Sequence, residues 1–178
     1  MKNTDQSLTF YVPGGQAIAS GVEISCSATG VTQVRFVRAS RAARADSAAA
    51  RAFGAQHAWF RPAVAALGGY LDGQASELAD IPVDLSRQPA FRRRVQEACR
   101  RIGYGRTLTY AELAQRVRSP GAARAEGSAM SQNPVPHMVP CHRVVRGDGG
   151  LGGFSAPSGV ALKAQLLAME RRDARLGE

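Results

Sequence analysis

The sequence predicts an α+β protein with a small N-terminal sheet carrying helices and a helical C-terminal domain. Residues 8–37 are rich in β-branched and aromatic side chains, which favour strands. Apolar residues recur at helical spacing in the second half. Between them, the proline-containing stretch 80–89 reads as an extended linker. The 178 residues suffice for two small domains, so we expect an α/β domain at 1–86 and a second domain at 87–178.

The N-terminal half supports strands followed by helices. The segments LTFYV and VTQVRFV predict strands, and Thr29–Gly30 predicts a turn before the second of them. The Ala- and Arg-rich residues 39–56 predict a helix. A second helical stretch follows, with Pro62 near its start and a pair of glycines, Gly68–Gly69, as its expected end.

The C-terminal half contains the pattern of a helix-turn-helix. Residues 91–102 predict one helix, and Thr109 with Glu112 three residues later predicts the capped start of the next. After the tight turn Ser119–Gly121 comes a short helix of small residues, and a last helix is expected at about 159–173. Two short helices joined in this way are typical of DNA binding, although many helical hairpins share the pattern.

The charge of the chain is unevenly distributed. The net charge is +9, of which residues 1–87 carry +1 and residues 88–178 carry +8. Such a surface favours a polyanionic partner, and the alternative is a basic protein without one. No apolar run is long enough to cross a bilayer and no leader opens the chain, so we expect a soluble, cytoplasmic protein with no membrane partner.

One cysteine lies in an unusual setting. Cys141 and His142 are adjacent in NPVPHMVPCHRVV, framed by prolines and followed by arginines. A positive field favours the reactive thiolate, so Cys141 is a candidate nucleophile. Neighbouring side chains on an extended segment point to opposite faces, which argues against direct pairing of the two. The simpler alternative is a buried structural cysteine. Three scattered Cys and three His give no zinc-ligand spacing and no disulfide framework.

Several segments together resemble one family of DNA-repair proteins. The segment VPCHRVV is preceded by RTLTYAELA and AARAEGSAMSQNPVP and followed by GGFS and LLAME. In this order they resemble the O6-alkylguanine-DNA alkyltransferases, also called methylated-DNA–protein-cysteine methyltransferases. The likeness is detailed from Phe91 to Glu170 and looser upstream.

The resemblance implies a single-use alkyl acceptor. Cys141 would take the alkyl group from O6-alkylguanine, or from O4-alkylthymine, in an irreversible displacement. His142 would receive the thiol proton through a water, Glu170 would orient that imidazole, and Tyr110 would donate to the base. The resemblance assigns four further residues to the substrate: Val144, Ser155, Pro136 and Phe154. It implies no organic cofactor, and we assign no metal.

The resemblance also implies how DNA is held. Arg124 would fill the stack vacated by a flipped base, and Asn133 would tie the recognition helix to the active-site turn. The small residues Ala122, Ala123, Gly127 and Ser128 would let that helix press into the minor groove of duplex DNA, with a monomer as the binding species. Gln96, Gly103, Glu126 and Phe154 depart from the family pattern.

Two other functions remain open from the sequence. A diverged paralogue could bind lesions or regulate without transferring alkyl groups. A Cys-His hydrolase would need an oxyanion hole, and its histidine usually comes from a distant part of the chain.

Overall fold

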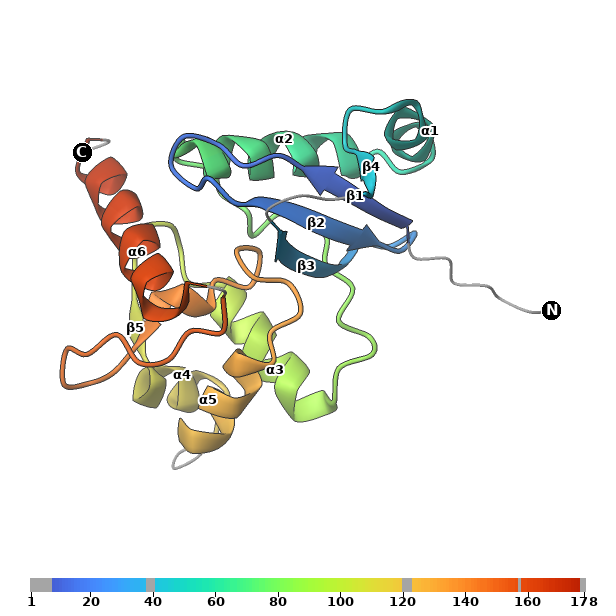
Figure 1. Cartoon of the computed structure of the whole chain (residues 1–178). Helices are drawn as coiled ribbons and strands as arrows, with labels where there is room; N and C mark the ends of the chain where they lie inside the picture. Colours follow the sequence, from blue (N-terminus) through green and yellow to red (C-terminus); the bar gives the residue numbers. More distant parts are fainter. Residues whose placement is uncertain (1–7, 38–40, 120–122, 157, 177–178) are drawn as a thin grey trace. The chain divides into compact units, whose positions relative to one another are not determined.

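The computed structural model describes residues 8–37, 41–119, 123–156 and 158–176, and the chain forms two compact units, Met1–Leu85 and Ser86–Glu178. Within the described residues, no helix has the length and apolarity needed to cross a membrane. The two units are mixed in type, the first built around a sheet and the second mostly helical (Figure 1). The α+β class expected from the sequence is confirmed.

The first unit is a four-stranded sheet with two helices. The strands are β1 (Leu8–Val12), β2 (Gly21–Cys26), β3 (Val31–Val37) and β4 (Ala43–Arg44), in the order β3-β2-β1-β4. β1 and β3 run antiparallel to β2, and β4 runs parallel to β1. The helices are α1 (Ala48–Gln56) and α2 (Phe60–Asp72).

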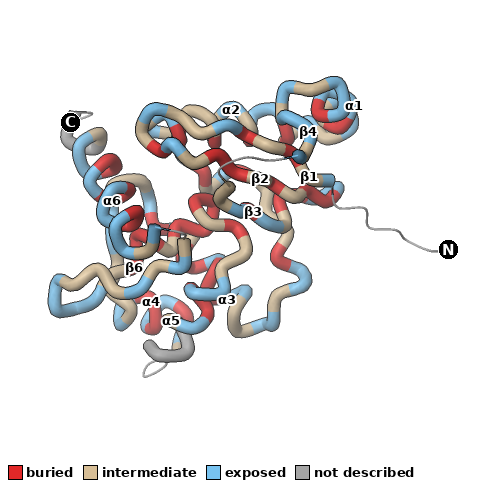
Figure 2. Tube along the Cα trace, in the orientation of Figure 1, coloured by how far each residue is buried: buried red, intermediate tan, exposed pale blue. Residues whose placement is uncertain are grey.

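Alternation along the strands places the core of this unit on one face of the sheet. Phe10 of β1 is buried, and its ring lies 5.5 Å from that of Phe53 and 4.8 Å from that of Phe60. These two partners come from α1 and α2, so the aromatic cluster joins both helices to the sheet. Figure 2 marks buried positions in red on α1 and on the strands of this unit. Aromatic contacts of this kind add to the burial of apolar area.

Two boundaries differ from the sequence prediction. The helix expected from residue 39 begins only at Ala48, because Ser47 accepts the N–H of Ala50 as an N-cap. Part of the preceding stretch pairs with β1 instead as β4. α2 continues through its glycine pair and ends at Asp72, and its C-cap Gly73 has a φ of 89°, the left-handed conformation that favours glycine.

The second unit packs helices around a short parallel pair of strands. Its helices are α3 (Ala90–Arg100), α4 (Tyr110–Arg116), α5 (Ala123–Ser131) and α6 (Gly159–Leu176), with a 3-10 turn η1 (Cys141–Arg143). The strands β5 (Leu108–Thr109) and β6 (Val144–Val145) pair in register, which brings the start of α4 beside η1. The predicted capping box of Thr109 and Glu112 is confirmed. α3, however, ends at Arg100, two residues before the predicted end of this helix at residue 102.

Among the described residues, the core of this unit includes a buried polar side chain without a hydrogen bond. Gln96 on α3 is fully buried, and neither amide atom has a hydrogen-bond partner among the described residues. An unsatisfied buried amide costs about 1–3 kcal/mol.

We therefore expect Gln96→Leu to raise the free energy of unfolding by about 1–2 kcal/mol, measured by urea denaturation. The matched control is Gln115→Leu, which makes the same change at an exposed position of α4 and should alter stability by less than about 0.5 kcal/mol. Equal effects of the two substitutions would show that the amide of Gln96 carries no such penalty.

Candidate active site

The thiol of Cys141 is held at the start of the 3-10 turn by the segment before it. Asn133 Nδ2 donates to the Val139 carbonyl at 2.7 Å and to Cys141 Sγ at 3.3 Å, while its Oδ1 accepts the N–H of Val135 at 3.0 Å. The amide of Asn133 therefore ties the end of the α5 segment to the active-site turn and also contacts the sulfur.

The 3-10 turn separates the two neighbouring side chains. Cys141 is partly exposed, whereas His142 is fully buried beneath it. The two adjacent residues thus place a partly exposed thiol next to a fully buried imidazole.

Cys141 opens into a pocket of about 210 Å³. This is smaller than the roughly 300–1,000 Å³ of pockets for drug-sized ligands. Eight residues line it: Tyr110, Gly127, Met130, Ser131, Cys141, Gly153, Phe154 and Ser155.

Most residues expected at the substrate lie around this pocket. Tyr110, Phe154 and Ser155 line it together with the thiol. Pro136 and Val144 are not among its lining residues, and the Val144 carbonyl accepts a hydrogen bond from Lys163. Met130, Ser131 and Gly153 lie within the sequence motifs, but no signal in the sequence assigned them to the site.

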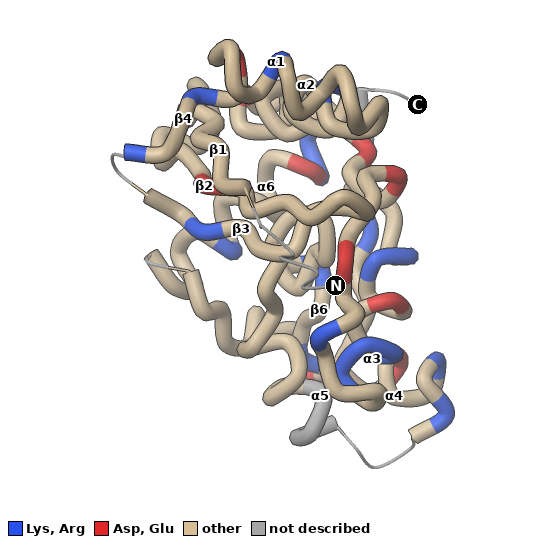
Figure 3. The backbone as a smooth tube through the Cα atoms, turned by 90° about the vertical axis from the view of Figure 1, so that its right-hand side faces the viewer, with Lys and Arg blue, Asp and Glu red and all other residues tan. Residues whose placement is uncertain are grey.

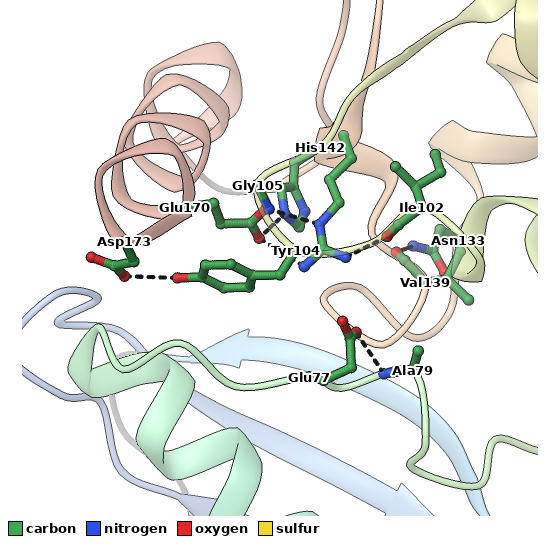
Figure 4. Close-up of polar contacts among 11 residues, drawn as sticks. Glu77, Ala79, Ile102, Tyr104, Gly105, Asn133, Val139, His142, Glu170 and Asp173 are labelled. Carbon is green, nitrogen blue, oxygen red and sulfur yellow. Dashed lines mark hydrogen bonds and ion pairs between the residues drawn. The ribbon is translucent and has the colours of Figure 1, made fainter. Parts of the chain in front are cut away.

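His142 belongs to a buried charged cluster. Its Nε2 lies 2.8 Å from Glu170 Oε1 (Figure 4). Arg143 donates to both oxygens of the same carboxylate, from Nε at 2.9 Å and from an Nη at 3.0 Å. The N–H of Gly105 is a further donor to Glu170 at 3.1 Å. All three charged or titratable side chains are at most 2% exposed.

Arg143 also links the cluster to the segment that follows α3. Its second terminal nitrogen donates to the Ile102 carbonyl at 2.6 Å, and its guanidinium lies 5.6 Å from the centre of the Tyr104 ring. Tyr104 in turn donates to Asp173 at 2.8 Å, one turn beyond Glu170 on α6 (Figure 4).

The environment sets the protonation of this cluster. Burial alone would raise the pKa of Glu170, but the hydrogen bonds from His142 and Arg143 outweigh it and lower that pKa to about 2. Burial lowers the pKa of His142, so the imidazole is neutral at physiological pH and can accept a proton.

Two groups at the pocket are protonated in the resting protein. Burial raises the pKa of the Cys141 thiol, opposed by the Asn133 hydrogen bond and the charge of Lys163. Burial also raises the pKa of Tyr110, so its phenol keeps its proton and can donate a hydrogen bond.

Lys163 is a buried cation close to the thiol that the sequence analysis missed. It is fully buried, and its Nζ donates to the Val144 carbonyl at 2.6 Å and to the Gly153 carbonyl at 3.4 Å. Lys163 therefore joins a wall of the pocket to strand β6. Its position was visible in the sequence, since Lys163, Leu166 and Glu170 follow the i, i+3, i+7 spacing of the buried stripe of α6.

The expected DNA-contacting residues all fall on or before α5. Gly127 lines the pocket, and Ser128 is exposed. Ala122 lies outside the described residues, and the structure describes only the backbone of Ala123 and Arg124. Among the described residues, no three His, Cys, Asp or Glu side chains are grouped to hold a metal.

Comparison with known proteins identifies relatives of both units. Residues 90–172 match the family model of the 6-O-methylguanine DNA methyltransferase DNA-binding domain. A methylated-DNA–protein-cysteine methyltransferase of Mycolicibacterium paratuberculosis is 46% identical over 113 residues, which are 64% of this chain and 66% of that protein. The bifunctional transcriptional activator/DNA repair enzyme Ada of Escherichia coli is 46% identical over 51% of this chain and 25% of its own length.

Solved structures extend the likeness to nearly the whole chain. The structure of Mycobacterium tuberculosis OGT in complex with DNA has a TM-score of 0.72 and 31% identity, covering 92% of this chain and 94% of that one. The M. tuberculosis O6-methylguanine methyltransferase superposes with a TM-score of 0.71 at 29% identity, covering 97% and 100%. With its pocket thiol and PCHR turn, the chain belongs to the O6-methylguanine-DNA methyltransferase (methylated-DNA–protein-cysteine methyltransferase) family.

Proposed function

We propose that this protein repairs O6-alkylguanine in duplex DNA by moving the alkyl group onto Cys141, once per molecule. One observation carries the proposal: the thiol opens into a base-sized pocket and is backed by a buried, neutral histidine that a carboxylate orients. The chemistry is that of an activated nucleophile with a base and an orienting acid.

The transfer is a displacement at the alkyl carbon. The thiol proton passes through a water to His142, whose positive charge Glu170 then stabilises at 2.8 Å. The sulfur attacks the carbon on O6, the S–C bond forms and the C–O6 bond breaks, so that guanine leaves with the bonding electron pair. A thioether cannot easily return to a thiol, so each molecule acts once.

Tyr110 assists the leaving base. Its protonated phenol lines the same pocket as the sulfur and donates to the purine ring as negative charge develops there. Phe154 offers its ring to the base and Ser155 a hydroxyl to O6. Pro136 and Val144 do not line the pocket, and only the family resemblance assigns them to the base. O4-alkylthymine is a second substrate by the same chemistry.

The lesion reaches the pocket by base flipping from the minor groove. A paired base is inaccessible inside the duplex, so it must be extruded before reaction. α5 supplies Gly127 to the pocket wall, which supports a position of this helix against the DNA. Arg124 occupies the vacated stack, and Ala122, Ala123 and Ser128 allow close approach of the backbone. The protein acts as a monomer, and the DNA complex of the M. tuberculosis relative supports DNA as the partner.

The proposal is tested with duplex DNA that contains labelled O6-methylguanine. We expect transfer of label to the protein to saturate at one group per chain and to vanish in Cys141→Ala. Cys26→Ala, which removes a buried thiol of the first unit, should transfer normally. A gel shift without transfer would instead indicate a lesion-binding paralogue, and neither shift nor transfer would fit a hydrolase.

The flipping role of Arg124 predicts a substrate-dependent loss. Arg124→Ala should slow repair of duplex DNA far more than reaction with free O6-benzylguanine, because the free base needs no extrusion. Both rates are obtained from intact-mass spectrometry of the alkylated protein. An equal loss on the two substrates would refute this role.

A further inference from the structure

A second hollow of the helical unit is lined mainly by arginines. It measures about 300 Å³ and lies between α3 and the end of α4. Seven residues line it: Arg94, Glu97, Ala98, Arg101, Arg116, Val117 and Arg118. We refer to it as the arginine groove, and Figure 3 shows the basic residues on α3 and beyond α4.

The arginine groove keeps a net positive charge among the described residues. All four arginines are exposed, and none forms an ion pair there. Glu97, the carboxylate in the lining, pairs with Arg93 outside the groove at 3.8 Å. Four like charges around one hollow repel one another, so the surface favours an anion that accepts from several guanidinium groups.

The backbone of the groove also carries strain. Arg118 has a φ of 55°, in the left-handed region that side-chain-bearing residues rarely adopt. This conformation costs about 1–2 kcal/mol for a residue other than glycine. Arg118 lies two residues beyond the end of α4.

The groove lies within reach of a duplex whose base enters the pocket. Tyr110 at the start of α4 lines the pocket, and Arg116 at its end lines the groove. The six residues of rise between them amount to about 9 Å. Because duplex DNA carries one charge per about 1.7 Å of helix axis, several phosphates lie within that distance of a flipped base.

We propose that the arginine groove binds backbone phosphates of duplex DNA beside the lesion. This inference rests on the proposed function and adds a contact surface distinct from α5 and from the pocket. The groove contributes affinity that does not depend on the base, since phosphates carry no direct sequence information. It takes no part in the alkyl transfer itself.

The test compares salt dependence of DNA binding between matched double variants. Arg101→Gln/Arg118→Gln removes two groove charges, and Arg51→Gln/Arg61→Gln removes two exposed charges from the first unit. Fluorescence anisotropy gives Kd for lesion-containing and undamaged duplexes from 50 to 200 mM NaCl. The logarithm of the association constant falls with log salt by about 0.9 for each phosphate contact, so each lost contact makes this slope less steep by about 0.9.

For the groove variant, we expect the slope of log association constant against log salt to be less steep by about 2. It should bind both duplexes more weakly, by the same factor. Glu97→Gln should bind more tightly than the wild type, because it removes the negative charge from the groove. A slope equal to that of the wild type or of the control double variant would overturn the proposal, as would weakening of the lesion duplex alone.

Reaction with free O6-benzylguanine separates this inference from the proposed function. The groove variant should alkylate Cys141 at the wild-type rate, because the free base makes no phosphate contact. If the wild type fails to react in this assay, the proposed alkyl transfer is refuted. The proposal for the arginine groove is tested separately, by the DNA-binding measurements.

Discussion

A Glu170→Gln variant is expected to lose about 3–5 kcal/mol of unfolding free energy and most of its alkyl-transfer activity. The substitution keeps the shape of the side chain but removes the charge that faces Arg143 and His142. A buried guanidinium then lacks its counter-charge, and the imidazole lacks the group that stabilises its protonated form. Thermal and urea unfolding measure the first loss, and O6-benzylguanine kinetics measure the second.

Two further variants separate stability from catalysis at this cluster. Replacing buried ion pairs by apolar side chains is often neutral, so Glu170→Gln/Arg143→Met should recover part of the lost stability. It should not recover the transfer rate, because His142 still lacks its carboxylate. Asp173→Asn is the control on the same helix, because the amide oxygen still accepts the Tyr104 hydroxyl and only the charge is lost, which should cost less than about 1 kcal/mol. Full catalytic recovery in the double variant would contradict the role of Glu170.

The same carboxylate predicts a dependence of stability on acid. The folded pKa of Glu170, about 2, lies below its ordinary value of 4.5, so its stabilisation is complete above the unfolded pKa. That stabilisation is lost as the pH falls from about 4.5 toward 2. Glu170→Gln should lack this part of the acid dependence.

A Lys163→Met variant is expected to transfer alkyl groups about 10- to 100-fold more slowly at neutral pH. The ammonium of Lys163 lowers the pKa of the Cys141 thiol, against the larger opposing effect of burial. Methionine keeps the bulk of the side chain and removes the charge, so the thiolate becomes scarcer at a given pH. The rate of reaction with O6-benzylguanine measures the change.

The pH profile distinguishes this electrostatic role from a structural one. Without the cation, the thiol pKa rises, so the rate should reach its half-maximum at higher pH and approach the wild-type rate in alkali. Leu166→Met, a conservative change in the core on the same helix, should leave the profile in place. A uniform loss at every pH would mean that Lys163 only holds the Gly153 wall through its hydrogen bond.

Local patterns were sufficient where a short stretch of chain decides its own structure. Thr109 and Glu112 form their capping box from side chains three residues apart. The strand at residues 8–12 follows from its alternating apolar residues. Predicted helix boundaries were wrong where the chain pairs with a segment distant in sequence. Ala43–Arg44, for example, pairs with β1 instead of extending a helix.

The sequence by itself indicated the family, the candidate nucleophile Cys141 and the main helices and strands, because the PCHR turn and its flanking motifs are contiguous stretches. The tertiary structure alone decided the surroundings of the thiol. It buried Glu170 against His142 and Arg143, brought Lys163 of α6 to the pocket wall, and gathered arginines of α3 and α4 around one groove. The physical reason is that burial and charge proximity arise from packing between helices, and no spacing along one helix specifies what lies opposite it.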